Sequence, residues 1–443
     1  MTAPVPPRRP RSAREAELLA SARRLLPSGV RTASANPDYA MVVASARGAR
    51  ITDASGNEYV DYLLGSGPLL LGHAHPAVTE AIREQLERGT GYLLVNEPAI
   101  RLAEALVELV PCAEAVTFHN TGSEAVFFAL RLARAARGRD AILKFEGAYH
   151  GMGDHALMST QWTRAPAPFP EAVPSSRGIP ASARAETLIA PFNDVATSTA
   201  LIEEHADRLA AVIVEPLQRT IPPAPGFLAD LRRVTAHHGI VLIFDEVVTG
   251  FRLALGGAQE RYGVTPDLCA LGKSISAGLP LGVVCGRRDL MTLADPERRE
   301  HGDGVLLTGT YSGNAVAAAA ALACIGELRR PGVHAALAAT GTRLMATLRR
   351  LCDDAGIAVS VQGEPAVFQP WFGTGQVVDH RSALAADAGR GAAFTDHLLA
   401  AGILKAHEKF FVSTVHHEED VARTEQAFAR AVERLASYRG TTE

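Results

Sequence analysis

Short apolar runs recur through the middle of the chain, and most are followed by a polar residue or a glycine. The clearest runs are Ala115–Phe118, Ala141–Phe145, Ala210–Val214, Ile240–Phe244, Leu268–Leu271 and Leu281–Cys285. Short apolar runs bounded by turn residues are typical of strands that are buried on both faces. The pattern therefore predicts that these segments are neighbouring strands of one largely parallel sheet.

Segments with helical periodicity alternate with the predicted strands. In the segment 123–137, apolar residues fall on one helical face: Ala125, Phe128, Ala129, Leu132 and Ala136. Alternating strands and helices predict an α/β fold in which helices cover both faces of a mostly parallel sheet. An alanine-rich helix from Asn314 to Leu328 is expected to close this part of the chain.

The two ends of the chain have a different pattern. A helix is predicted over residues 13–26, and a hairpin over 49–62 turns at Ser55-Gly56-Asn57. We expect residues 1–75 to form an N-terminal arm, helix and hairpin that join a smaller domain. Residues 76–330 would form the large domain, and 331–443 the C-terminal part of the small α+β domain, with the boundary at Arg330-Pro331-Gly332.

Composition narrows the class of protein. Of 443 residues, 47% are hydrophobic and 21% charged, which is typical of a soluble globular protein. The formal net charge of -4 gives no electrostatic footprint for nucleic acid or a membrane. No apolar segment follows the arginines of the N-terminal arm, so it does not resemble a secretory signal.

The cysteines favour a reducing, cytoplasmic location. There are five, and no two are spaced as a CxxC pair, which argues against a disulfide or zinc framework. Cys269 and Cys285 lie inside apolar runs and are expected to be small core residues.

Charged residues follow three of the predicted strands. Asp245 ends the run Ile240–Phe244, Glu215 follows Ala210–Val214, and Lys273 follows Leu268–Leu271 after one glycine. Open α/β sheets bind ligands at the carboxyl ends of their strands. The chain has only four lysines, and a lysine at a strand end can form an imine through its deprotonated amine, which an arginine cannot.

Two further segments at strand ends suit a flat, phosphorylated ligand. His119–Ser123 joins a strand to a helix amino terminus, where backbone N–H groups can bind a phosphate; an ordinary capped turn is the alternative. Tyr149 and His150 lie between glycines and offer an aromatic face; a packed turn is the alternative. Taken with Asp245 and Lys273, these features indicate pyridoxal 5′-phosphate: Asp245 would stabilise its protonated pyridine nitrogen, and Lys273 would hold its aldehyde as an imine.

Two other kinds of site are excluded by spacing. Asp245-Glu246 after an apolar run and Gly272-Lys273-Ser274 resemble parts of a nucleotide-binding P-loop protein, but the position that needs a glycine is Asp267. His73 and His75 lack acidic or cysteine partners at metal-ligand spacing, so no metal is expected.

Several motifs carry a family resemblance. They occur in this order: Asn120-Thr121-Gly122-Ser123-Glu124-Ala125, Tyr149-His150-Gly151, Glu215-Pro216, Asp245-Glu246-Val247-Val248-Thr249-Gly250-Phe251-Arg252, Leu271-Gly272-Lys273 and Gly309-Thr310-Tyr311-Ser312-Gly313-Asn314. The chain resembles the class III, fold-type I pyridoxal-phosphate aminotransferases, and most closely the subgroup of glutamate-1-semialdehyde 2,1-aminomutase. The resemblance runs from about residue 20 to the end of the chain.

The resemblance implies roles for individual residues. They are Lys273 as the Schiff-base lysine, Asp245 as the pyridinium partner, Gly122 and Ser123 as phosphate binders, Tyr149 and Val247 on the two ring faces, and Glu215 near the cofactor. Thr310 would bind the phosphate in the neighbouring subunit, which implies a homodimer. Arg31, in a segment that diverges from the subgroup, is the candidate clamp for a substrate carboxylate.

The expected activity is aminotransfer by a ping-pong mechanism, from an amino acid or amine donor to a keto or aldehyde acceptor. Three alternatives remain open at this point: an intramolecular aminomutase, a decarboxylase or epimerase on the same scaffold, and a binding protein without turnover. Neither nucleic acid nor a membrane is an expected partner.

Overall fold

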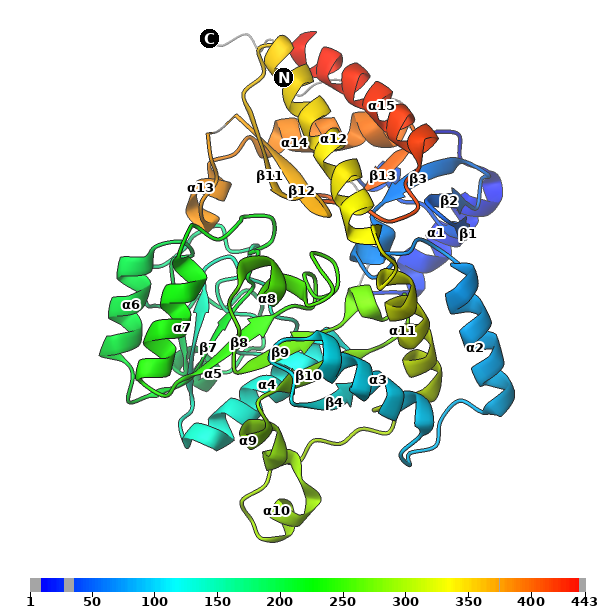
Figure 1. Ribbon diagram of the computed structural model, residues 1–443. Coiled ribbons are helices and arrows are strands. Elements are labelled where there is room, and N and C mark those ends of the chain that lie inside the picture. The colour runs from blue at the N-terminus through cyan, green and yellow to red at the C-terminus, as the bar shows by residue number, and fades with distance from the viewer. Residues whose placement is uncertain (1–8, 28–35, 374, 438–443) are drawn as a thin grey trace. The chain divides into compact units, whose positions relative to one another are not determined.

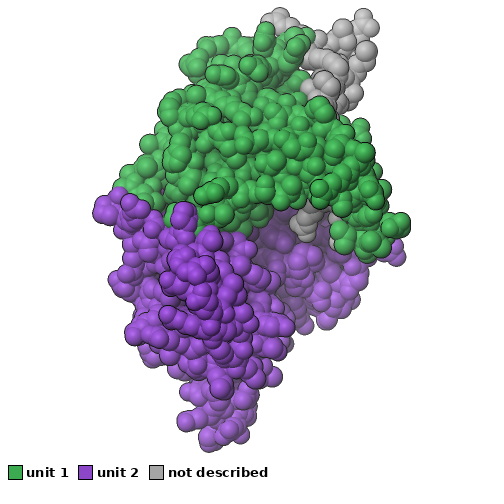
Figure 2. Space-filling view, turned by 90° about the vertical axis from the view of Figure 1, so that its right-hand side faces the viewer, with its two compact units in different colours: residues 1–75, 332–377, 385–443 green, residues 76–331, 378–384 purple. Residues whose placement is uncertain are grey.

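The computed structural model describes residues 9–27, 36–373 and 375–437. The chain divides into two compact units, which Figure 2 shows in separate colours. The smaller contains Met1–His75, Gly332–Val377 and Ala385–Glu443, and the larger contains Pro76–Pro331 and Val378–Leu384.

The segment Val378–Leu384 differs from the prediction, which assigned all of 331–443 to the small domain. It joins the larger unit through side-chain bonds. The Arg381 guanidinium donates to the Glu146 carboxylate at 2.9 and 3.1 Å, and the Asn193 amide donates to the Val378 carbonyl at 2.9 Å. Nothing in the local sequence signals these long-range partners.

The larger unit is built on a seven-stranded sheet of order β4-β10-β9-β8-β7-β5-β6 (Figure 1). Its strands are β4 Ala115–His119, β5 Ala141–Phe145, β6 Thr187–Ala190, β7 Leu209–Val214, β8 Val241–Asp245, β9 Leu268–Leu271 and β10 Gly282–Gly286. Its helices are α2 Pro76–Arg88, α3 Glu97–Leu109, α4 Gly122–Arg137, α5 Ala181–Ala185, α6 Val195–Glu204, α7 Phe227–His237, α8 Gly257–Tyr262, α9 Arg288–Met291, α10 Pro296–Glu300, α11 Ala315–Leu328 and α13 His380–Leu384. Two 3₁₀ turns complete it, η3 Lys273–Ile275 and η4 Thr292–Ala294.

The mostly parallel α/β fold is confirmed, with one local exception. The pairs β6–β5, β5–β7, β7–β8 and β8–β9 are parallel, whereas β10 runs antiparallel to both β9 and β4. Apolar runs alone do not reveal strand direction, so the sequence did not predict the reversal of β10.

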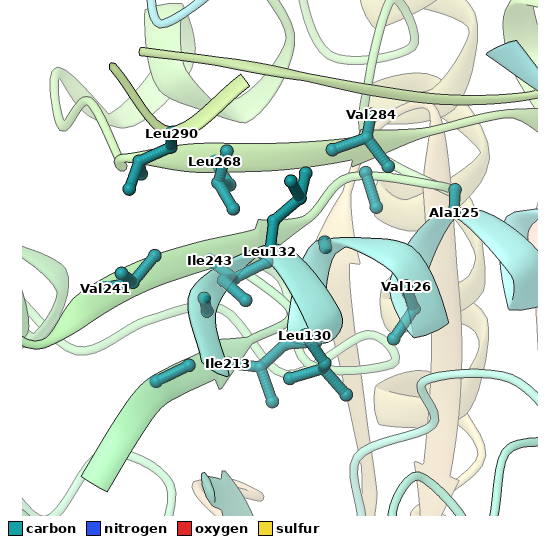
Figure 3. Packing of buried hydrophobic residues seen from close by; sticks show 14 of the residues in the cluster. Ala125, Val126, Leu130, Leu132, Ile213, Val241, Ile243, Leu268, Val284 and Leu290 are labelled. Carbon is teal, nitrogen blue, oxygen red and sulfur yellow. The ribbon is translucent and has the colours of Figure 1, made fainter. Parts of the chain in front are cut away.

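Helices pack on both faces of this sheet. Side chains of α4 form a buried cluster with alternate residues of β5, β7, β8, β9 and β10. In Figure 3, Leu130 and Leu132 of α4 lie among Ile213, Ile243 and Leu268 of the strands. The remaining strand residues point the other way, since successive side chains alternate between faces.

The second face is covered in part by α7. Phe227 at the start of α7 packs edge-on against Phe145 of β5, with ring centroids 5.4 Å apart. Phe145 and Phe227 also contact Phe192, and all three rings are fully buried.

The sheet brings the predicted site residues to one edge. Val214 at the end of β7 pairs with Phe244, and Asp245 at the end of β8 pairs with Ala270 of β9. Because these three strands are parallel and in register, the residues that follow them emerge side by side.

The smaller unit contains two sheets, of order β1-β2-β3-β13 and β11-β12-β14. Its strands are β1 Val43–Arg47, β2 Arg50–Asp53, β3 Glu58–Tyr62, β11 Val359–Glu364, β12 Val367–Phe372, β13 Ile403–Lys405 and β14 Phe410–Phe411. Its helices are α1 Ala13–Leu25, α12 Val333–Asp354, α14 Ala388–Ala400 and α15 Glu418–Ser437, with 3₁₀ turns η1 Pro37–Tyr39 and η2 Leu64–Ser66. β13 pairs in parallel with β3, so both ends of the chain contribute to one sheet.

None of the helices that the structure describes is both long enough and apolar enough to cross a membrane.

Candidate active site

The turn between β4 and α4 presents a helix amino terminus at the sheet edge. Thr121 is the N-cap, and its hydroxyl accepts from the Glu124 N–H at 3.1 Å. Glu124 in turn accepts from the Asn120 N–H at 2.7 Å. This reciprocal capping fixes the start of α4 and leaves the first helical residues, Gly122 and Ser123, at its positive end.

Close packing at this turn explains why two glycines are needed. A Cβ on Gly122 would lie 2.7 Å from a Val247 methyl, and a Cβ on Gly151 would lie 2.6 Å from the Ser123 hydroxyl. A Cβ on Gly272 would also be in contact with Val247, at 3.5 Å. The segments carrying Ser123, Val247 and Lys273 therefore converge at this point.

Asp245 is buried, and each of its carboxylate oxygens has one hydrogen-bond partner within the protein. The Asp245 Oδ2 lies 2.8 Å from His150 Nδ1, and Oδ1 accepts from the Val247 N–H at 3.1 Å. A carboxylate oxygen can accept two hydrogen bonds, so each still has capacity to face a ligand. His150 is itself buried, which fixes the orientation of the carboxylate.

Tyr149 is positioned through both its main chain and its ring. Its N–H donates to the buried Glu215 carboxylate at 3.0 Å. The ring packs edge-on against Trp162, with centroids 5.5 Å apart, and the Arg219 guanidinium lies 5.9 Å from the ring centre. Arg219 Nη1 is also 4.0 Å from Glu215 Oε1.

Lys273 follows β9 in a strained backbone conformation. Its φ of 34° is in the left-handed region, which is unfavourable for a residue with a side chain and is often found at functional sites. Burial lowers the pKa of the Lys273 amine, and the charges of Arg219 and Arg252 lower it further, while Asp245 and Glu215 oppose the shift. A lowered pKa increases the fraction of neutral, nucleophilic amine.

Glu246, next to Asp245, has a structural role. Its carboxylate accepts from the Thr249 hydroxyl at 2.9 Å, the Ala258 N–H at 2.5 Å and the Gln259 side-chain amide at 3.0 Å. Burial raises the pKa of Glu246 to about 7. With its oxygens engaged inside the protein, Glu246 does not resemble the metal-directed acid of a nucleotide-hydrolysing site.

Two predicted residues are not tied to this cluster by any described contact, although Gly309 and Ser312, which flank Thr310, line a cavity together with Ser123. Thr310 is exposed on the loop between α10 and α11, and within the described part of the chain no hydrogen bond joins it to the other predicted residues. Arg31 lies outside the described residues. The remaining predicted residues are contributed by the segments that converge at the sheet edge.

Three contributors were missed as site residues by sequence reasoning. His150 was recognised only as part of an aromatic pair, and its bond to Asp245 joins segments 95 residues apart. Arg219 was not considered, although its position four residues after Glu215 is a usable signal. Lys144 was noted only as one of four lysines, and its buried amine donates to the carbonyls of Ala148, Ala156 and Met158 around the Tyr149 loop.

Comparisons with known proteins identify the family of the chain. The family model for class III aminotransferases matches residues 32–409. The glutamate-1-semialdehyde 2,1-aminomutase of Pelotomaculum thermopropionicum is 41% identical over 432 residues, covering 94% of this chain and 97% of that protein.

The similar solved structures are also transaminases and aminomutases. An omega-transaminase from Sphaerobacter thermophilus superposes with a TM-score of 0.89 at 36% identity, covering 96% of this chain and 98% of that one. A glutamate-1-semialdehyde aminomutase from Pseudomonas aeruginosa PAO1 superposes with a TM-score of 0.84 at 27% identity, covering 95% and 94%. With the family model spanning most of its length, the chain belongs to the class III aminotransferase family.

Proposed function

We propose that this protein is a pyridoxal-phosphate-dependent aminotransferase that moves an amino group from an amino acid or amine donor to a keto or aldehyde acceptor. The observation that carries the proposal is the pairing of Lys273 with Asp245 at adjacent strand ends. One is an amine whose pKa is lowered by burial, and the other is a buried carboxylate aimed by His150. A related solved structure, at 31% identity and a TM-score of 0.86, is a transaminase with this cofactor bound.

The residues present fit that cofactor. The amino terminus of α4 and the Ser123 hydroxyl suit a phosphate, and Asp245 offers a fixed acceptor for a protonated ring nitrogen. Val247 and Tyr149 supply an aliphatic and an aromatic surface for the two faces of a flat ring. When bound, pyridoxal phosphate supplies an electron sink for the charge that develops on the substrate carbon.

The protein's own contribution to the reaction centres on Lys273. Its neutral amine can bind an aldehyde covalently and, once displaced by an amino substrate, can take a proton from the substrate carbon and return it to a neighbouring position. Arg219 and Glu215 lie within electrostatic range of this amine. We infer that they orient the polar groups of the substrate beside the Tyr149 ring.

The second candidate function is intramolecular amino transfer. It is favoured by the relatives that are named glutamate-1-semialdehyde 2,1-aminomutase, which are 38–41% identical to this chain. An aminomutase needs one amino-aldehyde substrate and no separate acceptor. A transaminase needs both a donor and an acceptor, so omission of each reactant in turn distinguishes the two.

The first experiment is a visible absorption spectrum of the purified protein with pyridoxal phosphate, before and after amino donors are added. We expect a band from the lysine-bound cofactor that one donor bleaches and a keto acid restores. Lys273→Ala should lose the band and reduce kcat by at least about 10²–10⁴-fold, the usual contribution of a general acid–base group. Ser274→Ala, which changes the next residue in the same turn, should retain both.

Other results, from the spectra or from analysis of the reaction products, would contradict the proposal. A band that persists in Lys273→Ala would show that another amine holds the cofactor. Carbon dioxide release, or loss of substrate chirality without amino transfer, would identify a decarboxylase or an epimerase. A stable band with no turnover of any amino compound would leave a binding protein.

We also propose that the protein acts as a homodimer in which Thr310 serves the partner's cofactor. The Thr310 loop is tied to the loop after α2, because the Asn96 amide donates to the Gly313 carbonyl at 2.9 Å and the Asn314 amide donates to the Thr90 carbonyl at 2.8 Å. These joined loops carry exposed apolar side chains: Leu93, Leu94, Val95 and Tyr311, which are 77%, 76%, 84% and 66% exposed. An exposed apolar surface of this kind suits a second copy of the chain.

A further inference from the structure

Three cysteines that are far apart in the sequence meet inside the larger unit. Cys112 follows α3, Cys269 lies in β9 and Cys285 lies in β10. Their sulfur atoms are all within 4.8 Å of one another, and all three residues are buried. Across residues 9–27, 36–373 and 375–437, no other group of three or more histidine, cysteine, aspartate or glutamate residues brings its potential ligand atoms within this distance of one another.

The sheet explains why two of these thiols meet. Cys269 and Cys285 are directly opposite each other on the adjacent strands β9 and β10 (Figure 1). Their neighbours Leu268, Ala270 and Val284 belong to the cluster that packs on α4. Because side chains alternate along a strand, both thiols point to the other face of the sheet.

The third thiol is held against the same face by a polar network. The Cys112 N–H donates to the Gln259 side-chain oxygen at 3.0 Å, and the Gln259 side-chain nitrogen donates to Glu246 at 3.0 Å. The rigid sheet and this network therefore present three sulfur atoms with little freedom to separate.

The spacing suits a single soft cation. Zinc–sulfur bonds are about 2.3 Å long, so sulfurs that share an ion are roughly 4 Å apart. Small side-chain rotations would bring the present sulfurs to that separation. Glu246 is committed to Thr249, Ala258 and Gln259, so the ligand set is sulfur alone. Sulfur-only sets favour thiophilic ions such as Zn²⁺ and Cu(I) over Mg²⁺ or Ca²⁺.

We propose that Cys112, Cys269 and Cys285 form a binding site for one thiophilic metal ion, which ties the segment after α3 to β9 and β10. Binding releases three thiol protons to solvent as three sulfur–metal bonds form, and the sulfurs are not oxidised or reduced. The role is structural and does not depend on the proposed transamination. The lack of CxxC spacing argued against a zinc framework built from one local motif, and that argument does not apply when the ligands come from two strands and a separate turn.

The test is a titration of the full-length, cofactor-loaded protein with Cd²⁺, a spectroscopic probe for thiolate sites. We expect an ultraviolet sulfur-to-cadmium charge-transfer band that saturates at one ion per chain. Because the thiols are buried, uptake should be slow and limited by local opening. Cys269→Ser and Cys112→Ser should lose the band, whereas Cys352→Ser, which removes a buried thiol in the smaller unit, should keep it.

The proposal is overturned if no band forms after prolonged incubation or after refolding in the presence of Cd²⁺. It is also overturned if the band persists in Cys269→Ser. Should the variants fail to fold, X-ray absorption of the zinc-loaded wild-type protein decides the question. A shell of three sulfurs near 2.3 Å would support the site, and a shell of nitrogen or oxygen alone would overturn it.

Discussion

At the scale of single residues, the hydrogen bond between His150 and Asp245 is expected to position the Asp245 carboxylate, and substitution of His150 tests this role. Replacing His150 with Ala removes the donor that aims the Asp245 carboxylate. Loss of a charge-assisted hydrogen bond costs about 1.5–3 kcal/mol, so we expect kcat to fall by about 10–100-fold. His150→Asn, whose amide can still donate to Asp245, should recover part of the loss. Steady-state kinetics with saturating cofactor are the measurement, and equal activity in the wild type and both variants would contradict the positioning role.

The residue scale is also where the sequence was least informative. Asp245 and Lys273 could be proposed from the sequence because a charged residue at, or one glycine beyond, the end of an apolar run is a clear local signal. His150, Arg219 and Lys144 were not, because their roles depend on partners that are remote in the sequence or lie in an irregular loop. The three-cysteine cluster has the same origin, since its members are 16 to 173 residues apart.

At the scale of elements, the contact between the start of α4 and Val247, in the turn after β8, predicts that substitutions on its two sides compensate each other. Gly122→Ala places a methyl 2.7 Å from a Val247 methyl, so the start of α4 or the Val247 side chain must shift at the proposed cofactor site. We expect the Kd for the cofactor to rise about tenfold, which corresponds to a loss of about 1.4 kcal/mol of binding free energy. Val247→Ala makes room for that methyl, so the double variant should bind the cofactor better than Gly122→Ala alone. Equilibrium titration followed by absorbance measures both affinities, and additive losses would contradict a steric cause.

The loop after β5 gives a prediction about pH. Lys144 is fully buried among three carbonyls, and burial lowers its pKa to about 7. In the unfolded chain the pKa returns to about 10.4. Between these values the unfolded state binds more protons, so the stability of the larger unit should rise with pH, by at most about 1.4 kcal/mol per pH unit from this group.

Lys144→Met should make that rise shallower, whereas Arg139→Met, which removes an exposed cation, should not. The chain has two tryptophans, and Trp371→Phe leaves Trp162 as a fluorescence reporter of the larger unit. Urea unfolding at pH 7 and pH 9 in that background gives the slopes. An unchanged slope in Lys144→Met would show that this lysine keeps its proton when folded.

The positions of the strands were predicted more accurately than the way in which the strands pair. The six expected strands agree with the structure to within one residue at each end, because apolar runs bounded by turns are a strong local signal. β6 was missed, since Thr187–Ala190 is short and follows a segment rich in proline and serine. The reversal of β10 was not visible either, because direction is decided by the path of the connection and not by side-chain pattern.

At the scale of the whole molecule, a shared active site can be tested with hybrid dimers. Thr310→Ala and Lys273→Ala should each be weakly active or inactive alone. If Thr310 serves the partner's site, a hybrid dimer has one site with both residues intact and one with neither. Random exchange in equal mixtures should therefore restore about a quarter of wild-type activity, as expected for a symmetric dimer. Recovery no greater than the average of the separate variants would place Thr310 outside the partner's site.

The pairing of β3 with β13 affects how the protein is made on the ribosome. Val60 emerges early in synthesis, but its strand partner Ile403 emerges only near the end of translation. Both segments of the larger unit lie between these two residues in the sequence, so this unit can fold while the chain is still growing. Until then the nascent β3 has an open edge that could pair wrongly. Truncated or prematurely terminated chains should therefore aggregate through the first sheet, even when the catalytic unit is complete.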